Sequence, residues 1–173
     1  MTADSPGSPA QGAARATDLV EVRLLALRLA DLRDAQAHHD ELFREFALIA
    51  GNDPSKAHDV PARLLAVIEE LGGRFVAFTT GPQDELAAAM ERGEVEVDVS
   101  FHVPPAIEEG AARFAELLNE ADAYCRNGNL LTLAPPPSSV AFRNWYLGEF
   151  LAQARGADPT PWPEYRARSL SAP

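Results

Sequence analysis

Apolar and polar residues alternate strictly from Glu94 to Val103, and no other pattern in the sequence restricts the fold as much. Successive side chains of a β-strand point to opposite faces, so this pattern predicts a strand with one buried and one solvated face. A second segment with the character of a strand is residues 20–29. Its middle, Leu24 to Leu27, has no polar position, which predicts burial on both faces. Two strands are too few for a sandwich or a doubly wound sheet.

Most of the remaining chain shows the apolar period of amphipathic helices. The predicted helices are residues 31–50, 60–78, 81–93, 107–125 and 138–155. Gly81 and Pro82 are expected to separate the second helix from the short third one. The neighbouring Gly72 and Gly73 predict a kink, because each glycine costs about 1 kcal/mol in helix propensity. We therefore expect an α+β, helix-dominated fold, in which a bundle of about five helices covers a small two-stranded β element.

The two ends of the chain differ in composition from its middle. Residues 1–18 contain Ala, Ser, Pro, Gly and scattered polar residues without an apolar period, so nothing offsets the entropy of ordering them. They are predicted to form a disordered N-terminal tail. Residues 158–173 are rich in proline and are expected to be extended and partly docked. Residues 19–157 are expected to form a single globular helical domain.

Charge and composition argue against several classes of protein. The formal net charge is -11, which repels nucleic-acid phosphates, and no basic stripe offsets that repulsion. No apolar run reaches the roughly 18 residues of a membrane-spanning helix, and no secretory signal is visible. Cys125 is the single cysteine, so an internal disulfide cannot form. We expect an acidic, cytoplasmic protein that binds neither nucleic acid nor membrane.

Familiar catalytic and metal-binding patterns do not occur in the sequence. His38, His39, Glu41 and Glu45 lie close together on one predicted helix, but their spacing fits neither a di-iron bundle nor a zinc protease. The helical period assigns His39 to the apolar stripe and His38 to solvent. There is no phosphate-binding glycine loop, nucleophile elbow or dinucleotide motif. We therefore expect no catalytic residue, no cofactor and no metal, and hence no enzyme.

The last predicted helix carries more aromatic side chains than one buried face can hold. Phe142, Trp145 and Tyr146 lie on faces that adjoin its core stripe. Two interpretations remain open: the proline-rich tail folds back so that Trp162 packs on these rings, or the rings form a protein-docking surface. The candidate partner-binding residues are Arg143, Trp145, Tyr146, Glu149 and Trp162.

Five segments together resemble an uncharacterised family of actinobacterial proteins. They are Val60–Leu65, Val103–Pro105, Asn119–Arg126, Leu130–Leu133 and Phe142–Phe150. Genes of that family lie near those of anti-sigma-factor kinases, antagonists and phosphatases, and the resemblance covers residues 20–163. It implies an accessory role in partner-switching signalling, with a protein partner of the anti-sigma-factor or antagonist type, and no established active site. The chain lacks both the phosphorylatable serine turn of an antagonist and the Asp-x-Gly-x-Gly motif of a kinase.

Two functions of different classes follow from these observations. The first is a non-enzymatic regulatory or protein-interaction domain, which the missing catalytic motifs and the surplus aromatic residues favour. The alternative is a small-molecule-binding sensor domain, with a cavity between the helical stripes and the strand at residues 95–103. An enzyme without recognisable motifs is a third alternative.

Overall fold

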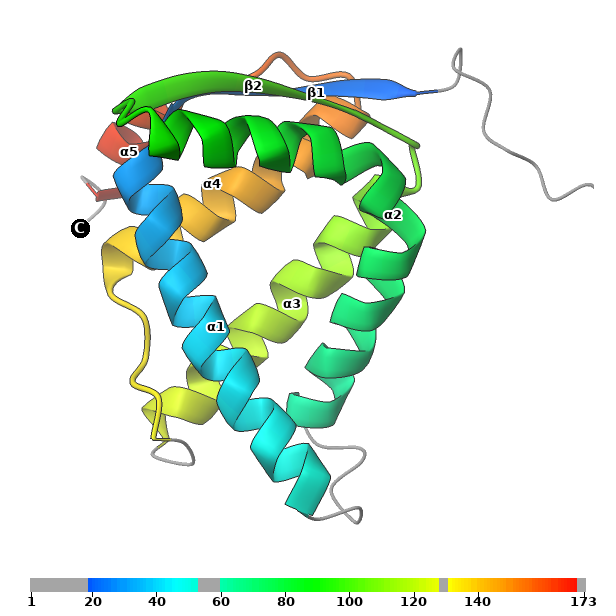
Figure 1. The fold of residues 1–173 in the computed structure, drawn as a ribbon, viewed down its shortest axis with the longest axis vertical. Coiled ribbons are helices and arrows are strands. Elements are labelled where there is room, and N and C mark those ends of the chain that lie inside the picture. Colours follow the sequence, from blue (N-terminus) through cyan, green and yellow to red (C-terminus); the bar gives the residue numbers. More distant parts are fainter. Residues whose placement is uncertain (1–18, 53–59, 128–130, 171–173) are drawn as a thin grey trace, which may run out of the picture.

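The computed structural model describes residues 19–52, 60–127 and 131–170. These residues form two strands and five helices, which confirms the predicted helix-dominated α+β fold (Figure 1). In chain order the elements are β1 (Val20–Arg28), α1 (Leu29–Asn52), α2 (Val60–Glu91), β2 (Glu96–Val103), α3 (Ile107–Arg126), α4 (Pro137–Ala154) and α5 (Trp162–Leu170). The tail predicted to be disordered, residues 1–18, lies outside the described residues. None of the described helices has both the length and the apolar character that crossing a membrane requires.

The two strands pair antiparallel, with Val20 opposite Val103. Glu21, Arg23 and His102 are exposed on the outer face of the sheet. β1 is therefore covered on one face only, whereas its apolar middle predicted burial on both. The face that meets the helices holds the buried side chains of Val22, Leu24, Leu27, Val99, Phe101 and Val103.

A β-bulge in β1 explains this difference. The register of the sheet shifts between Leu24 and Leu27, and Ala26 has a φ of 54°. The extra residue returns Leu27 to the buried face, so an uninterrupted apolar run can serve a strand that is covered on one side. The backbone N–H of Ala26 donates to Asp98 Oδ1 on β2 at 2.7 Å, which fixes the bulge in place.

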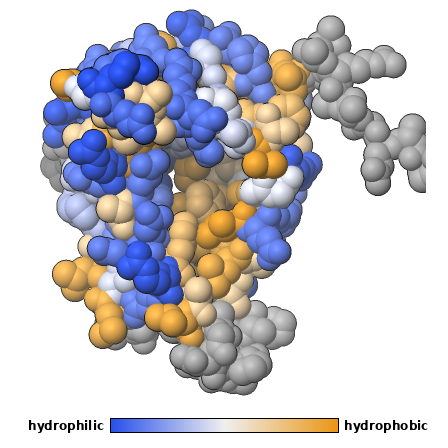
Figure 2. Space-filling view, in the orientation of Figure 1, coloured by the Kyte–Doolittle hydropathy of each residue, from blue (hydrophilic) through white to orange (hydrophobic). Residues whose placement is uncertain are grey.

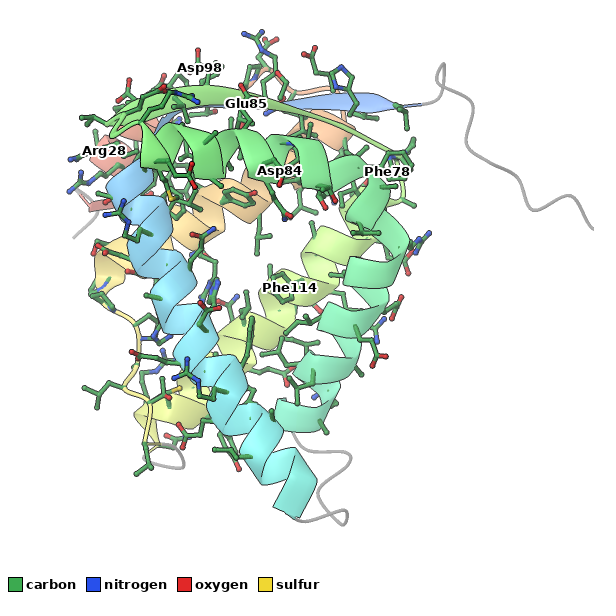
Figure 3. The ribbon with its side chains drawn as sticks, viewed as in Figure 1. Arg28, Phe78, Asp84, Glu85, Asp98 and Phe114 are labelled. Carbon is green, nitrogen blue, oxygen red and sulfur yellow. The ribbon has the colours of Figure 1, made fainter. Side chains whose placement is uncertain are left out.

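α2 is one continuous helix, not the two that the sequence predicted, and it bends sharply (Figure 1). Its first part packs against α3, and its second part turns to lie beneath the strands. Pro82 lies inside the helix and cannot donate a backbone hydrogen bond, while Thr80 Oγ1 donates to the carbonyl of Val76 at 2.7 Å. Figure 3 places Phe78 at the bend, so the bend lies near these residues and not at the Gly72–Gly73 pair.

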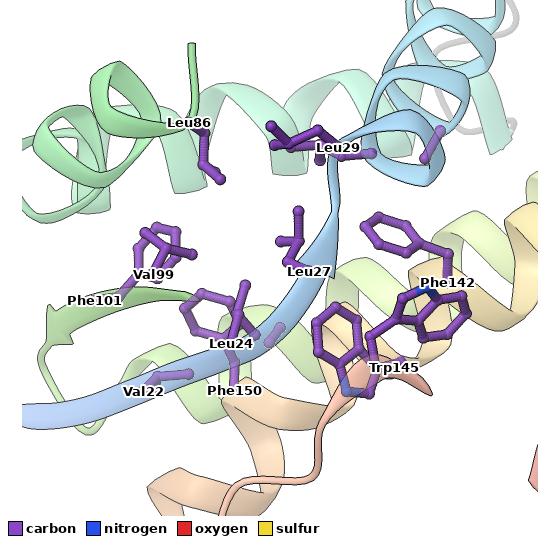
Figure 4. Close-up of a cluster of buried hydrophobic side chains, with 14 of the residues drawn as sticks. Val22, Leu24, Leu27, Leu29, Leu86, Val99, Phe101, Phe142, Trp145 and Phe150 are labelled. Carbon is purple, nitrogen blue, oxygen red and sulfur yellow. The ribbon is translucent and has the colours of Figure 1, made fainter. Parts of the chain in front are cut away.

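Two hydrophobic clusters hold the elements together. The larger cluster joins the sheet to α4, α5, the start of α1 and the second part of α2, and Figure 4 shows Phe142 and Trp145 of α4 beside Leu27 of β1. The smaller cluster joins the second half of α1 to the start of α2 and the end of α3, with Phe46 and Leu118 fully buried. The four longer helices thus pack tightly at two places and frame the space between them.

Candidate functional site

The C-terminal segment of the chain packs against the aromatic side chains of α4. Trp162, at the start of α5, is 1% exposed and meets Phe142 edge-on, with 5.2 Å between ring centroids. The indole Nε1 of Trp145 donates to the carbonyl of Thr160 at 2.8 Å, and the indole Nε1 of Trp162 donates to Asp31 Oδ2 at 2.7 Å. The proline-rich segment therefore folds back over α4. This is the first of the two interpretations that the sequence left open.

This segment is not extended throughout, because residues 162–170 form α5. Pro163 lies in the first turn of that helix, where a missing N–H leaves no intrahelical hydrogen bond unmade. The prediction of an extended tail is therefore wrong for residues 162–170, which are helical.

Arg143 forms a buried ion pair with Asp122 of α3. Its Nη2 donates to Asp122 Oδ2 at 2.6 Å and its Nη1 to Asp122 Oδ1 at 3.0 Å. Both side chains are at most 5% exposed. Nη2 also donates to Asn119 Oδ1 at 3.0 Å, and Nε is buried without a partner among the described residues. The bidentate contact pairs the positive charge of Arg143 with the negative charge of Asp122.

Glu149 and Gln153 tie α4 to β1 and to the C-terminal segment. Gln153 Oε1 accepts from the N–H of Arg23, and Gln153 Nε2 donates to the carbonyl of Arg23, both at 2.9 Å. Gln153 Nε2 also donates to Glu149 Oε2 at 2.7 Å, and the N–H of Thr160 donates to the same oxygen at 3.0 Å. These two polar side chains therefore hold the fold together.

The five candidate partner-binding residues lie mostly inside the protein. Arg143, Trp145, Glu149 and Trp162 are buried, and Tyr146 is partly buried. In this conformation the four buried side chains do not form an exposed surface, because Trp162 and its segment cover Trp145 and α3 covers Arg143. That they bind a partner stays a prediction.

A hollow lies between α1, α2, α3 and α4, and we call it the central hollow. It consists of three adjoining cavities of about 180, 300 and 380 Å³, and Tyr146 lines all three. Figure 2 shows hydrophobic residues inside it and hydrophilic residues around much of its rim, and Figure 3 shows Phe114 projecting from α3 into it. Its lining includes Gln36, His39, Phe75, Gln83, Phe114 and Tyr146.

The lining of the central hollow carries little net charge. Arg143 is the only charged side chain among its described lining residues, and Asp122 neutralises it. Burial, with the nearby charge of Arg143 as the second cause, lowers the pKa of His39 from 6.5 to about 4. Burial also raises the pKa of Tyr146. At pH 7 His39 is therefore an uncharged imidazole, and Tyr146 keeps its hydroxyl proton.

Of the two neighbouring histidines of α1, one lies in the surroundings that the sequence predicted and the other does not. His39 stacks on Phe43, with 5.7 Å between ring centroids, in keeping with its place on the apolar stripe. His38 was expected in solvent, but its Nε2 is buried without a hydrogen-bond partner among the described residues, and burial lowers its pKa. In the part of the chain that the structure describes, no group of three or more His, Cys, Asp or Glu side chains could hold a metal ion.

Sequence reasoning found only part of the central hollow. Phe75 and Phe114 belong to the predicted amphipathic helices 60–78 and 107–125, in which a side chain facing a cavity cannot be told from one in a packed core. Gln36 and Gln83 gave no signal, because a glutamine that faces a cavity looks like one that faces solvent. A cavity does occur at the place that the sensor hypothesis requires, since Phe101 of β2 lines one of the three. Ligand binding itself stays a prediction.

Comparison with known protein families, with curated proteins and with solved structures gave no match. The resemblance to the actinobacterial family therefore stays a prediction, as does the partner-switching role that it implies. What the chain does has to be inferred from its own residues.

Proposed function

We propose that the chain is a regulatory domain that binds a small molecule in the central hollow. The observation that carries this proposal is the largely apolar lining of the hollow, in which open cavities of about 180, 300 and 380 Å³ adjoin between four helices. Ligand sites are concave, mostly apolar and lined by a few polar groups. The central hollow has each of these properties.

Apolar side chains that line the hollow are left partly uncovered. Leu71, Phe114 and Leu147 are neither fully buried nor fully exposed, although they lie between packed helices. Each square ångström of apolar surface that a ligand removes from water contributes about 25 cal/mol. A ligand that covers these side chains would therefore bind mainly through apolar contact.

The polar groups of the hollow suit binding better than catalysis. His39 has a pKa of about 4, which makes it a weak base at pH 7. Tyr146 keeps its proton because burial raises its pKa, and Arg143 is held by Asp122. None of these three side chains is arranged as an activated nucleophile or as its base. We therefore propose a domain that binds its ligand without converting it.

The glycine pair of α2 offers a matched test of this proposal. Gly72 lines the hollow and Gly73 does not, and an added Cβ meets no atom within 4 Å at either position. We expect Nile red, an uncharged apolar dye, to bind the chain with enhanced fluorescence. Gly72→Leu should weaken that binding roughly tenfold by filling part of the hollow, and Gly73→Leu should leave it unchanged.

Both leucine variants should fold, because leucine favours a helix by about 1 kcal/mol over glycine. A melting temperature at or above that of the unmodified chain checks this for each variant. Equal loss of dye binding in the two variants, or no dye binding by the unmodified chain, would count against a ligand site in the hollow.

A second function, binding of a protein partner, is favoured by one exposed apolar loop. Leu131 and Leu133 are 92% and 83% exposed. Glu45 of α1 fixes this loop, because its carboxylate accepts from the N–H of Leu131 at 2.7 Å and from the N–H of Thr132 at 2.8 Å. A pre-ordered loop loses less entropy on docking than a flexible one. We propose it as the alternative contact for a regulator of the partner-switching type.

Pull-down with purified partner-switching regulators tests this alternative. The double change Leu131→Ser and Leu133→Ser should abolish capture of the regulator. Val95→Ser, at an apolar position that is 72% exposed elsewhere on the surface, is the matched control and should leave capture unchanged. Capture that survives the double change would exclude the loop as the contact.

A further inference from the structure

We infer that the ligand of the central hollow is an uncharged amphiphile, an apolar body that carries one hydroxyl, amide or carbonyl head group. The head group lies against Tyr146, Gln36 and Gln83, and the body lies along Phe75 and Phe114. This inference rests on the proposed function and adds to it the chemical class of the ligand and its orientation.

Three uncharged polar side chains from different helices line the largest of the three cavities. They are Gln36 of α1 and Gln83 of α2, which are exposed to solvent, and Tyr146 of α4, which is partly buried. No hydrogen bond joins their side chains to another residue in the described part of the chain. An amide and a phenol hydroxyl each provide both donors and acceptors. A ligand hydroxyl, amide or carbonyl can therefore form hydrogen bonds here without displacing any bond within the protein.

The neighbouring cavity can hold the apolar body of the ligand. Gln83 and Tyr146 line both cavities, so the cavity with the polar side chains opens directly into this second one. Five aromatic rings line it: those of Phe114 and Tyr146 are partly exposed, and those of Phe75, Phe101 and Phe150 form a buried wall behind them. The hydroxyl of Thr79 also lies there, but it donates to the carbonyl of Phe75 at 3.3 Å. An apolar body can therefore extend along these rings from a head group held at Tyr146.

The charges around the hollow argue against an ionised head group. None of its described lining residues is Asp or Glu, so a cation would find no counter-ion there. The one guanidinium, that of Arg143, already holds Asp122 at 2.6 Å, so an anion would meet a neutralised pair in a chain of net charge -11. Burying an unpaired charge costs far more than burying an uncharged polar group that is hydrogen-bonded. The hollow should therefore select uncharged ligands.

Three ligands with the same alkyl chain test this selection: 1-decanol, decanoate and decylammonium. Each competes with Nile red for the chain at physiological ionic strength, where long-range attraction to the acidic protein is screened. We expect 1-decanol to displace the dye at a concentration at least about tenfold lower than either charged ligand. A charged ligand that binds as tightly as 1-decanol would overturn the inference and leave the proposed function standing. If neither the dye nor any of the three binds, the proposed function fails as well.

The position of the head group is tested by removing one hydroxyl. Tyr146→Phe keeps the ring and should raise the Kd of 1-decanol roughly three- to tenfold through the lost hydrogen bond. Tyr165 of α5 lies outside the hollow, so Tyr165→Phe is the matched control and should leave the Kd unchanged. Melting temperatures of both variants show that the fold is kept. An unchanged Kd in Tyr146→Phe would overturn the inferred orientation.

Discussion

Arg143 and Asp122 differ from the other ion pairs of the described residues in being almost fully buried, with side chains 5% and 4% exposed. The pair of Arg113 and Glu70, in contrast, is 54% and 48% exposed. A buried pair adds little net stability, but the loss of one partner leaves an uncompensated charge in the interior. We therefore regard the pair as a constraint that sets α3 against α4 beside the central hollow.

Replacing one partner of this pair should be strongly destabilising. We predict that Arg143→Met lowers the free energy of unfolding by about 3–5 kcal/mol, because Asp122 stays buried and unpaired. The control, Arg113→Met, should lower it by at most about 1 kcal/mol, because its pair is exposed to solvent. Urea denaturation followed by tryptophan fluorescence measures both. Similar losses in the two variants would show that the buried pair does not exist in solution.

His39 should make the stability of the chain depend on pH. Its pKa is about 4 in the folded chain, against an ordinary value of 6.5. Between these values the unfolded chain binds a proton that the folded chain does not, so stability falls as the pH is lowered from 6.5 and levels off near 4. We predict that His39→Leu removes on the order of 2 kcal/mol of this loss. Urea denaturation across that pH range measures it, and equal slopes for variant and unmodified chain would contradict it.

At the scale of single elements, the spacing of apolar residues predicted those features that depend only on residues close together in the sequence. The alternation in β2 and the apolar stripes of α1 and α3 are such features, and these elements lie where the sequence predicted them. The bulge at Ala26 depends on one residue in an unusual backbone conformation, which an apolar run does not reveal. α5 was missed because three nearby prolines suggested an extended chain, although Pro163 is compatible with a first helical turn.

The site was less predictable than the elements, for a related reason. Tyr146 stood out in the sequence as a surplus aromatic residue, but its role as a lining residue depends on how four helices cross. Arg143 and Asp122 are 21 residues apart and meet only after α3 and α4 have packed. No local period encodes such crossings, so the sequence identified the aromatic residues of α4 but not what their side chains contact.

The bulge in β1 should be improved by glycine. Ala26 has a φ of 54°, a conformation that residues with a Cβ adopt at a cost and glycine adopts freely. We predict that Ala26→Gly raises the free energy of unfolding by about 1 kcal/mol. Ala88→Gly, the control within helix α2, should lower it by about 1 kcal/mol. Thermal denaturation measures both, and a loss of stability in Ala26→Gly would show that the bulge is unstrained.

α5 and the segment before it should contribute to stability mainly through Trp162. We predict that Trp162→Ala lowers the free energy of unfolding by about 3–5 kcal/mol, because it leaves a cavity beside Phe142 and Trp145. Trp162→Phe should cost about 1–2 kcal/mol, mainly for the lost hydrogen bond to Asp31. Arg168→Ala, at an exposed side chain of the same helix, should change stability little. An unchanged melting temperature in Trp162→Ala would mean that the segment is not docked in solution.

At the scale of the whole molecule, the central hollow follows from where the helices do and do not meet. The sheet, α4 and α5 pack tightly at one place, and α1, α2 and α3 pack tightly at another. The space between them is lined by residues of both clusters, such as Phe75 and Leu118. A ligand that bridges the two clusters would stabilise the fold by linkage, by about 2.7 kcal/mol at a hundred times its Kd.

The central claim, that the hollow is a ligand site, is tested most directly by intermolecular nuclear Overhauser effects between 1-decanol and the chain. We predict contacts from the methylene protons of the ligand to the ring protons of Phe75 and Phe114, and none to Leu131 on the outer loop. Contacts confined to Leu131 and Leu133, or none at a saturating concentration of 1-decanol, would contradict the claim.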